Sequence, residues 1–156
     1  MGETLANMRR REEDDRGFTM IELLVVVVII GVLVAIAVPV YLNYRKGAAN
    51  KSAASDVRGA VTAIEQYYTE NGNVYPDDFT GTKATNQTLA KKSGGTDQTI
   101  TVSPGNTLQY KNNTSSYVIC AQNDVGLLIY VYNSSVGGSV KTSTQADLAT
   151  CVANGN

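Results

Sequence analysis

The sequence predicts an α+β fold, in which a long N-terminal helix packs on a small antiparallel β-sheet with a C-terminal disulfide-bounded loop. Three observations carry this prediction. Residues 23–42 contain no charged and no polar side chain, a helical apolar pattern continues beyond them to residue 71, and short β-type segments with turn residues between them follow. A chain of 156 residues suffices for one small domain plus an anchor.

The apolar run favours a retained membrane anchor. Twenty residues at the helical rise span about 30 Å, the thickness of the hydrocarbon core of a bilayer. The run is too long for the core of a signal peptide, which has about 7 to 15 residues, and no A-x-A-like site follows it. We therefore expect four segments: a leader (1–17), an anchoring half-helix (18–42), an amphipathic half-helix (43–75) and a globular sheet domain (76–156).

The helical pattern does not stop where the anchor ends. Apolar residues recur at spacings of three and four, which is the stripe of an amphipathic helix: Ala54, Val57, Val61, Ile64 and Tyr68. Charged residues are expected to lie largely off this stripe: Asp56, Arg58, Glu65 and Glu70. Asn71-Gly72 supplies a stop signal, so one helix over residues 18–71 is predicted.

The C-terminal half is typical of a small antiparallel sheet. Residues 77–97 are polar and rich in turn formers, and Asp77-Asp78 is expected to lie in a turn rather than to form a catalytic carboxylate pair. Four β-type segments are expected to form a meander that packs on the helical stripe: 98–103, 107–112, 116–122 and 126–133. Both faces of the last segment are apolar, so it should be covered on both sides.

The two cysteines, Cys120 and Cys151, lie late in the chain, and the chain contains no histidine. Their spacing resembles no metal site, so a disulfide is the economical interpretation, and it would place the C-terminal domain outside the cytoplasm. Two buried free thiols are the alternative.

The residues Gly17-Phe18-Thr19-Met20-Ile21-Glu22, followed by the Val/Ile/Leu run, resemble the processing site of type IV pilins (prepilins) and their pseudopilin relatives. Gly31 and Pro39 resemble the helix-weakening positions of that family. The resemblance implies that a prepilin peptidase cuts between Gly17 and Phe18 and methylates the new amine of Phe18. The leader departs from the family's short basic pattern because four acidic residues, 12–15, precede the cut.

Glu22 is an acid placed inside an anchoring helix, where a charge is costly. Cutting at Gly17 creates an ammonium group on Phe18, four residues earlier and on the same helical face. In a filament, the ammonium of one subunit could meet Glu22 of its neighbour and set the register. The alternative is that Glu22 only favours the N-terminus of its helix.

The resemblance implies a structural subunit of a type IV pilus, acting in adhesion, motility or DNA uptake. Its partners would be other copies of the chain, the prepilin peptidase, the pilus assembly machinery and, before assembly, the inner membrane; after processing the protein would be extracellular. The alternatives are a pseudopilin of a type II secretion or competence system and a membrane-anchored binding module that does not polymerise.

No catalytic arrangement, cofactor motif or metal-ligand spacing is evident, so we expect no enzyme and no cofactor. Residues 59–156 carry five lysines against seven acids, which gives no nucleic-acid-binding stripe.

Overall fold

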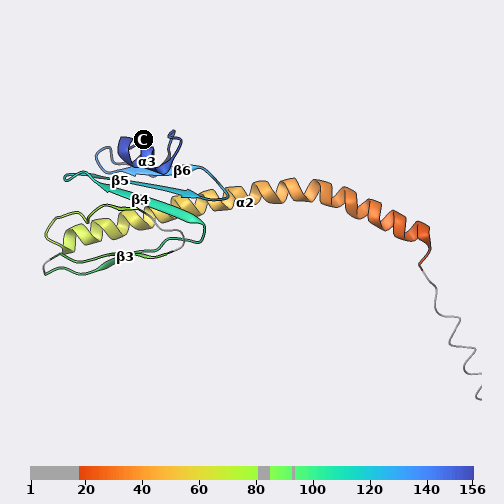
Figure 1. Ribbon diagram of the computed structural model, residues 1–156, viewed down its shortest axis with the longest axis horizontal. Coiled ribbons are helices and arrows are strands. Elements are labelled where there is room, and N and C mark those ends of the chain that lie inside the picture. The colour runs from red at the N-terminus through yellow and green to blue at the C-terminus, as the bar shows by residue number, and fades with distance from the viewer. Residues whose placement is uncertain (1–17, 81–84, 93) are drawn as a thin grey trace, which may run out of the picture. The chain divides into compact units, whose positions relative to one another are not determined.

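The computed structural model describes residues 18–80, 85–92 and 94–156 (Figure 1). The expected leader, including Gly17, lies outside the described residues. The chain divides into two compact units, Met1–Tyr41 and Leu42–Asn156. The predicted combination of a long helix, antiparallel sheets and a C-terminal disulfide is confirmed.

The long helix is α2, Met20–Glu70, with 51 residues. It begins two residues later and ends one residue earlier than expected. Gly72 and Asn73 follow it with φ angles of 72° and 58°, and this left-handed backbone ends the helix.

The predicted stripe on α2 is confirmed in part, since Ala54, Val57 and Ile64 are buried. Val61 and Tyr68 are only half-buried, whereas the fully buried face is formed by Ala53, Ala54, Val57, Ala60, Ile64 and Tyr67. Asp56, expected off the stripe, is 7% exposed, so that prediction is wrong. Its burial has a physical reason, because hydrogen-bond donors from the sheet domain surround its carboxylate, as described below.

One five-stranded antiparallel sheet forms the centre of the second unit, with strand order β1-β4-β5-β6-β7. Its strands are β1 Phe79–Thr80, β4 Asn106–Asn112, β5 Tyr117–Asn123, β6 Ile129–Asn133 and β7 Lys141–Thr142. The consecutive pairing of β4, β5 and β6 confirms three strands of the expected meander, and β5 is the central strand of the sheet. β7 lies outside the predicted strands.

A separate hairpin corrects the prediction for residues 77–103. β3, Gln98–Ile100, does not join the meander but pairs with β2, Gln87–Leu89. The segment expected to be only turns thus contains β1 and β2. Leu89 and Ile100 are 4% and 1% exposed, so the hairpin forms because it buries these two side chains in the main core.

Two hydrophobic clusters lie on opposite faces of the large sheet. The first joins the buried face of α2 to the sheet and the hairpin. Figure 1 shows α3, Leu148–Asn154, on the other face of the sheet. The second cluster joins α3 to that face and contains Val118, Cys120, Ile129, Val131, Leu148 and Cys151. Side chains of β6 contact both clusters, so its predicted burial on two sides is confirmed. Leu127 and Leu128, included in that predicted strand, instead precede β6 and are exposed.

Candidate functional site

Glu22 closes a capping box at the start of α2. Thr19 is the residue before the first helical turn, and Glu22 is the third residue of the helix. The Thr19 backbone N–H and hydroxyl donate to Glu22 Oε2 at 2.9 and 2.7 Å, and the Glu22 N–H donates to Thr19 Oγ1 at 3.3 Å. These reciprocal bonds satisfy N–H groups that a helix start leaves free. These hydrogen bonds therefore support the alternative interpretation, in which Glu22 stabilises the N-terminus of its helix.

This capping arrangement leaves Glu22 exposed at the head of an apolar surface. Phe18, on which the resemblance places the new amine, is 78% exposed. The side chains from Leu23 to Leu42 are also exposed within the described chain, and α2 is long and apolar enough to cross a membrane. A helical surface of this kind is unfavourable in water, so it requires lipid or other protein as its environment.

Gly31 and Pro39 both lie inside the continuous helix. No atom lies within 4 Å of the position that a Cβ on Gly31 would take. Pro39 has no N–H to donate to the carbonyl of Ala35, so one helical hydrogen bond cannot form. Their proposed helix-weakening role in assembly stays a prediction.

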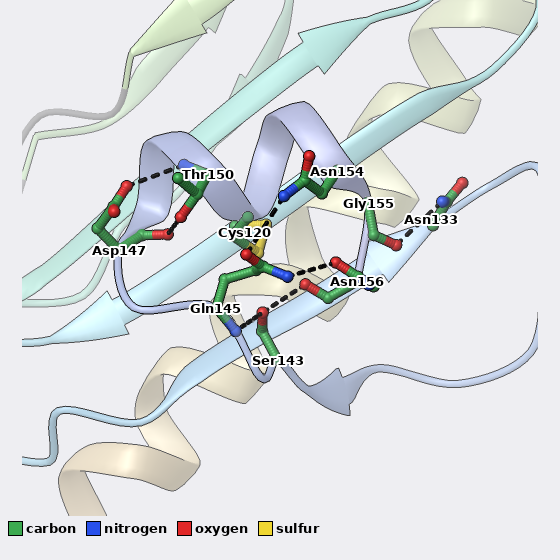
Figure 2. Close-up of a disulfide and its surroundings, with 10 residues drawn as sticks. Cys120, Asn133, Ser143, Gln145, Asp147, Thr150, Asn154, Gly155 and Asn156 are labelled. Carbon is green, nitrogen blue, oxygen red and sulfur yellow. Dashed lines mark hydrogen bonds between the residues drawn. A yellow bond between two sulfur atoms is a disulfide. The ribbon is translucent and has the colours of Figure 1, made fainter.

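Cys120 and Cys151 form the predicted disulfide, which joins β5 to α3 (Figure 2). Their Cα atoms are 6.3 Å apart, and both residues are fully buried. The alternative of two free thiols is excluded, since no free cysteine is present among the described residues, which include both cysteines of the sequence.

Hydrogen bonds at both ends of α3 support this crosslink (Figure 2). Asp147 Oδ1 accepts from the Thr150 N–H at 2.8 Å, and this bond lowers the pKa of Asp147. At the other end, Gly155 donates to the Cys151 carbonyl at 2.8 Å, while Asn133 Nδ2 donates to the Gly155 carbonyl at 3.0 Å. The short helix is thus capped at both ends and tied to the end of β6.

Asp77 and Asp78 bind different lysines, as expected of a turn rather than a carboxylate pair. Asp78 accepts from Lys111 Nζ at 2.7 Å and from the Asn112 N–H at 2.6 Å. The hydrogen bond from Lys111 lowers the pKa of Asp78. Asp77 pairs with Lys92 at 3.0 Å. These contacts tie the connection after α2 to the sheet.

A buried carboxylate network that the sequence analysis missed joins α2 to the loop before β4. Asp56 Oδ2 accepts from the Ser103 N–H at 2.7 Å and from Asn106 Nδ2 at 2.6 Å, and Oδ1 accepts from Ser103 Oγ at 2.8 Å. Asn123 Nδ2 in turn donates to Asn106 Oδ1 at 2.6 Å. The network thereby joins the spine helix to both β4 and β5.

We expect Asp56→Ala to lower the free energy of unfolding by about 2 to 3 kcal/mol, because it leaves buried donors of Ser103 and Asn106 without an acceptor. Urea unfolding of the unit 42–156 measures this change. Asp77→Ala is the control, since Asp77 lies in an exposed ion pair, and it should change stability little. Equal stability of Asp56→Ala and the parent would contradict the assigned role of the network.

No group of three or more potential metal-ligating side chains occurs in the part of the chain that the structure describes. Among the remaining acids, Asp97 Oδ1 accepts from the Lys91 N–H at 2.8 Å.

Comparison with known proteins supports the resemblance to type IV pilins that the N-terminal residues show. The family model for the prokaryotic N-terminal methylation motif matches residues 14–38. A type IV major pilin protein PilE from Neisseria gonorrhoeae is 38% identical over 65 residues, which cover 42% of this chain and 38% of the pilin. Fimbrial protein EcpC from Eikenella corrodens is 41% identical over 63 residues, 40% of each chain.

A type II secretion system core protein G from Pectobacterium carotovorum subsp. carotovorum is similar to the same degree, 39% identical over 69 residues and 44% of each chain. The chain thus spans less than half the length of these curated relatives. No solved structure matches. The resemblance of the N-terminal part to type IV pilins and pseudopilins is confirmed.

Proposed function

We propose that this chain is a structural subunit of a type IV pilus, which polymerises through its N-terminal helix. One observation carries the proposal: the methylation motif matches residues 14–38, a range in which Glu22 precedes the exposed apolar run 23–42. Similarity to a major pilin and a fimbrial protein supports it.

In the proposed pathway the apolar half of α2 has two successive environments. Before assembly, residues 18–42 lie in the inner membrane, and the disulfide-containing unit lies outside the cytoplasm, where its crosslink persists. After the leader is removed, the assembly machinery transfers the helix into the core of an extracellular filament, where helices of other copies replace lipid. The covalent chemistry belongs to the prepilin peptidase, so the chain itself acts as a structural protein without a cofactor.

Deletion of the gene, followed by electron microscopy of the cell surface, tests the proposal. Loss of long pili that returns on complementation is the expected result. Pili of unchanged number in the deletion strain would contradict a major structural role.

A pseudopilin is the second candidate, because a type II secretion system core protein G is 39% identical over 69 residues. This candidate predicts that the deletion abolishes secretion or competence while surface pili remain unchanged. A non-polymerising anchored module predicts neither defect and no processing of the leader.

We expect the mature protein to begin at Phe18 and to carry one methyl group on its amine. Removal of the 17 leader residues from 156 leaves 139 residues, and intact-mass spectrometry of the surface protein measures this loss. The control is Gly17→Trp, since a bulky side chain before the cut should block the peptidase. A surface form that retains Arg16 and Gly17 would contradict the proposed processing.

A further inference from the structure

An open cleft of about 750 Å³ lies between the connection that follows α2 and the turn that joins β4 to β5. We call it the polar cleft. Its lining residues are Asn73, Val74, Tyr75, Asp77, Asp78, Asn112 and Thr114. All of them belong to the unit 42–156, and sites for small molecules usually have about 300 to 1,000 Å³. The polar cleft is therefore large enough for a small organic ligand.

Hydrogen bonds hold the two walls of the polar cleft together. The Asn112 N–H donates to Asp78 Oδ1 at 2.6 Å, and Asn112 Oδ1 accepts from the Thr114 N–H at 2.7 Å. The Tyr75 ring stacks on the ring of Tyr68, with their centres 4.4 Å apart. Because these contacts fix both walls within the free chain, a ligand would not have to order them when it binds.

Two residues of the polar cleft have an unfavourable backbone conformation. Asn73 and Thr114 have φ angles of 58° and 70°, and they are two of the three non-glycine residues with positive φ in the part of the chain that the structure describes. Asparagine tolerates this conformation, but a β-branched threonine does not favour it. Such positions cluster at binding sites, where they aim a side chain. Both side chains are exposed and form no hydrogen bond with another described residue, so both are free to bind a ligand.

The charges at the polar cleft cancel one another. Asp77 pairs with Lys92 at 3.0 Å, and Asp78 pairs with Lys111 at 2.7 Å. Both oxygens of Asp78 already accept hydrogen bonds, whereas Asp77 uses only Oδ1 and has a side chain that is 88% exposed. The cleft thus offers neither a pair of free carboxylates to a metal ion nor an unpaired lysine to an anion.

We propose that the polar cleft is a binding site for an uncharged saccharide unit. A pyranose ring carries hydroxyl groups around a face of C–H groups, and each hydroxyl both donates and accepts. The free groups of the cleft match this chemistry, since the Asp77 carboxylate accepts and the Asn73 amide and Thr114 hydroxyl do both. Val74, which is 47% exposed, and Tyr75 supply apolar surface for the C–H face.

This inference goes beyond the proposed structural role. A single site of this kind is weak because a few exposed hydrogen bonds provide most of its affinity. A filament that repeats the site in every subunit would bind a glycan-covered surface much more tightly, because the sites act together. Binding by one subunit does not depend on polymerisation, so the two proposals can be tested separately.

Titration of the full chain with the methyl glycosides of galactose, mannose and N-acetylglucosamine tests the inference. The ¹⁵N-labelled chain is kept in dodecylphosphocholine micelles, because a glycoside detergent would itself present a sugar. We expect one of these glycosides to shift the amide resonances of residues 73–78 and 112–114, with a Kd of about 1 to 10 mM.

Glycine variants remove the free side chains without adding strain, because glycine readily adopts positive φ. Asn73→Gly and Thr114→Gly should each weaken binding about fivefold, since each loses one hydrogen bond to the sugar. Asn113→Gly is the matched control. This exposed asparagine precedes Thr114 in the same turn but does not line the polar cleft, so its loss should leave the Kd unchanged.

Each other outcome overturns the inference. No shift with any of the three glycosides shows that the polar cleft does not take an uncharged saccharide. Shifts caused by calcium chloride or sodium phosphate, and not by the glycosides, assign the cleft to an ion. An equal Kd for the parent, Asn73→Gly and Thr114→Gly places the bound sugar elsewhere. A negative titration leaves the pilus proposal intact, because that proposal is tested by the surface pili of the deletion strain.

Discussion

Glu22→Gln is expected to leave the chain inserted in the membrane but to abolish pili at the cell surface. The substitution keeps the shape of the side chain and its place in the capping box, because glutamine serves this position as well as glutamate. It removes only the charge. An incoming subunit then buries the ammonium of Phe18 without a carboxylate partner, and breaking a buried pair in this way weakens a contact by about 100-fold or more.

Thr19→Ala is the matched control, because it removes the hydroxyl that donates to Glu22 and accepts from the Glu22 N–H, while the carboxylate remains. We expect this variant to build pili in near-normal number. Membrane fractionation and electron microscopy of both strains provide the measurement. Normal piliation of Glu22→Gln would refute the charge-register argument. Loss of pili in Thr19→Ala alone would show that capping, rather than charge, is what assembly requires.

The N-terminal half of the molecule could be predicted because its signals are local. The spacing from Gly17 to Glu22 and the length of the apolar run each depend on consecutive residues. The capping box was also readable, since Thr19 and Glu22 have the Thr-x-x-Glu pattern directly before an apolar helix. It was missed because the acid was considered for its charge and not for the backbone groups beside it.

The predictions that were wrong concern places where segments far apart in the sequence contact one another. Asp56 is buried because donors from residues 103 and 106 reach it, and no periodicity within the helix reveals donors about 50 positions away. The pairing of β2 with β3 was missed for a related reason. β2 contains a single buried side chain, Leu89, so it shows no alternation that could mark it as a strand.

The disulfide could be predicted from the count of cysteines, but its structural role could not. Cys120 lies on the central strand of the sheet and Cys151 on a seven-residue helix. A helix of this length is not stable alone, so α3 depends on its attachments. Of these, Leu148 and the crosslink provide the buried contacts in the second cluster, and Asn133 adds a hydrogen bond at the C-terminal cap.

Replacing both Cys120 and Cys151 by alanine is therefore expected to cost about 3 to 4 kcal/mol in the free energy of unfolding of the unit 42–156. The bond closes a loop with a sequence separation of 31, and its removal restores conformational freedom to the unfolded chain. The melting temperature should fall by about 10 to 20 °C for a unit of this size. Calorimetry of the oxidised, reduced and double-alanine forms provides the measurement.

Hydrogen exchange shows where stability is lost in the double-alanine variant. The Thr150 and Cys151 amides of α3 should exchange at a rate close to that of an unfolded chain, while the paired amides of β4 and β5 stay protected, because the first cluster does not include α3. Asp147→Ala removes the N-cap but keeps the crosslink, so it should loosen the first turn with a smaller decrease in melting temperature. An unchanged melting temperature on reduction, or α3 amides that stay as protected as those of β4 and β5, would contradict the role of the disulfide as the attachment of α3 to β5.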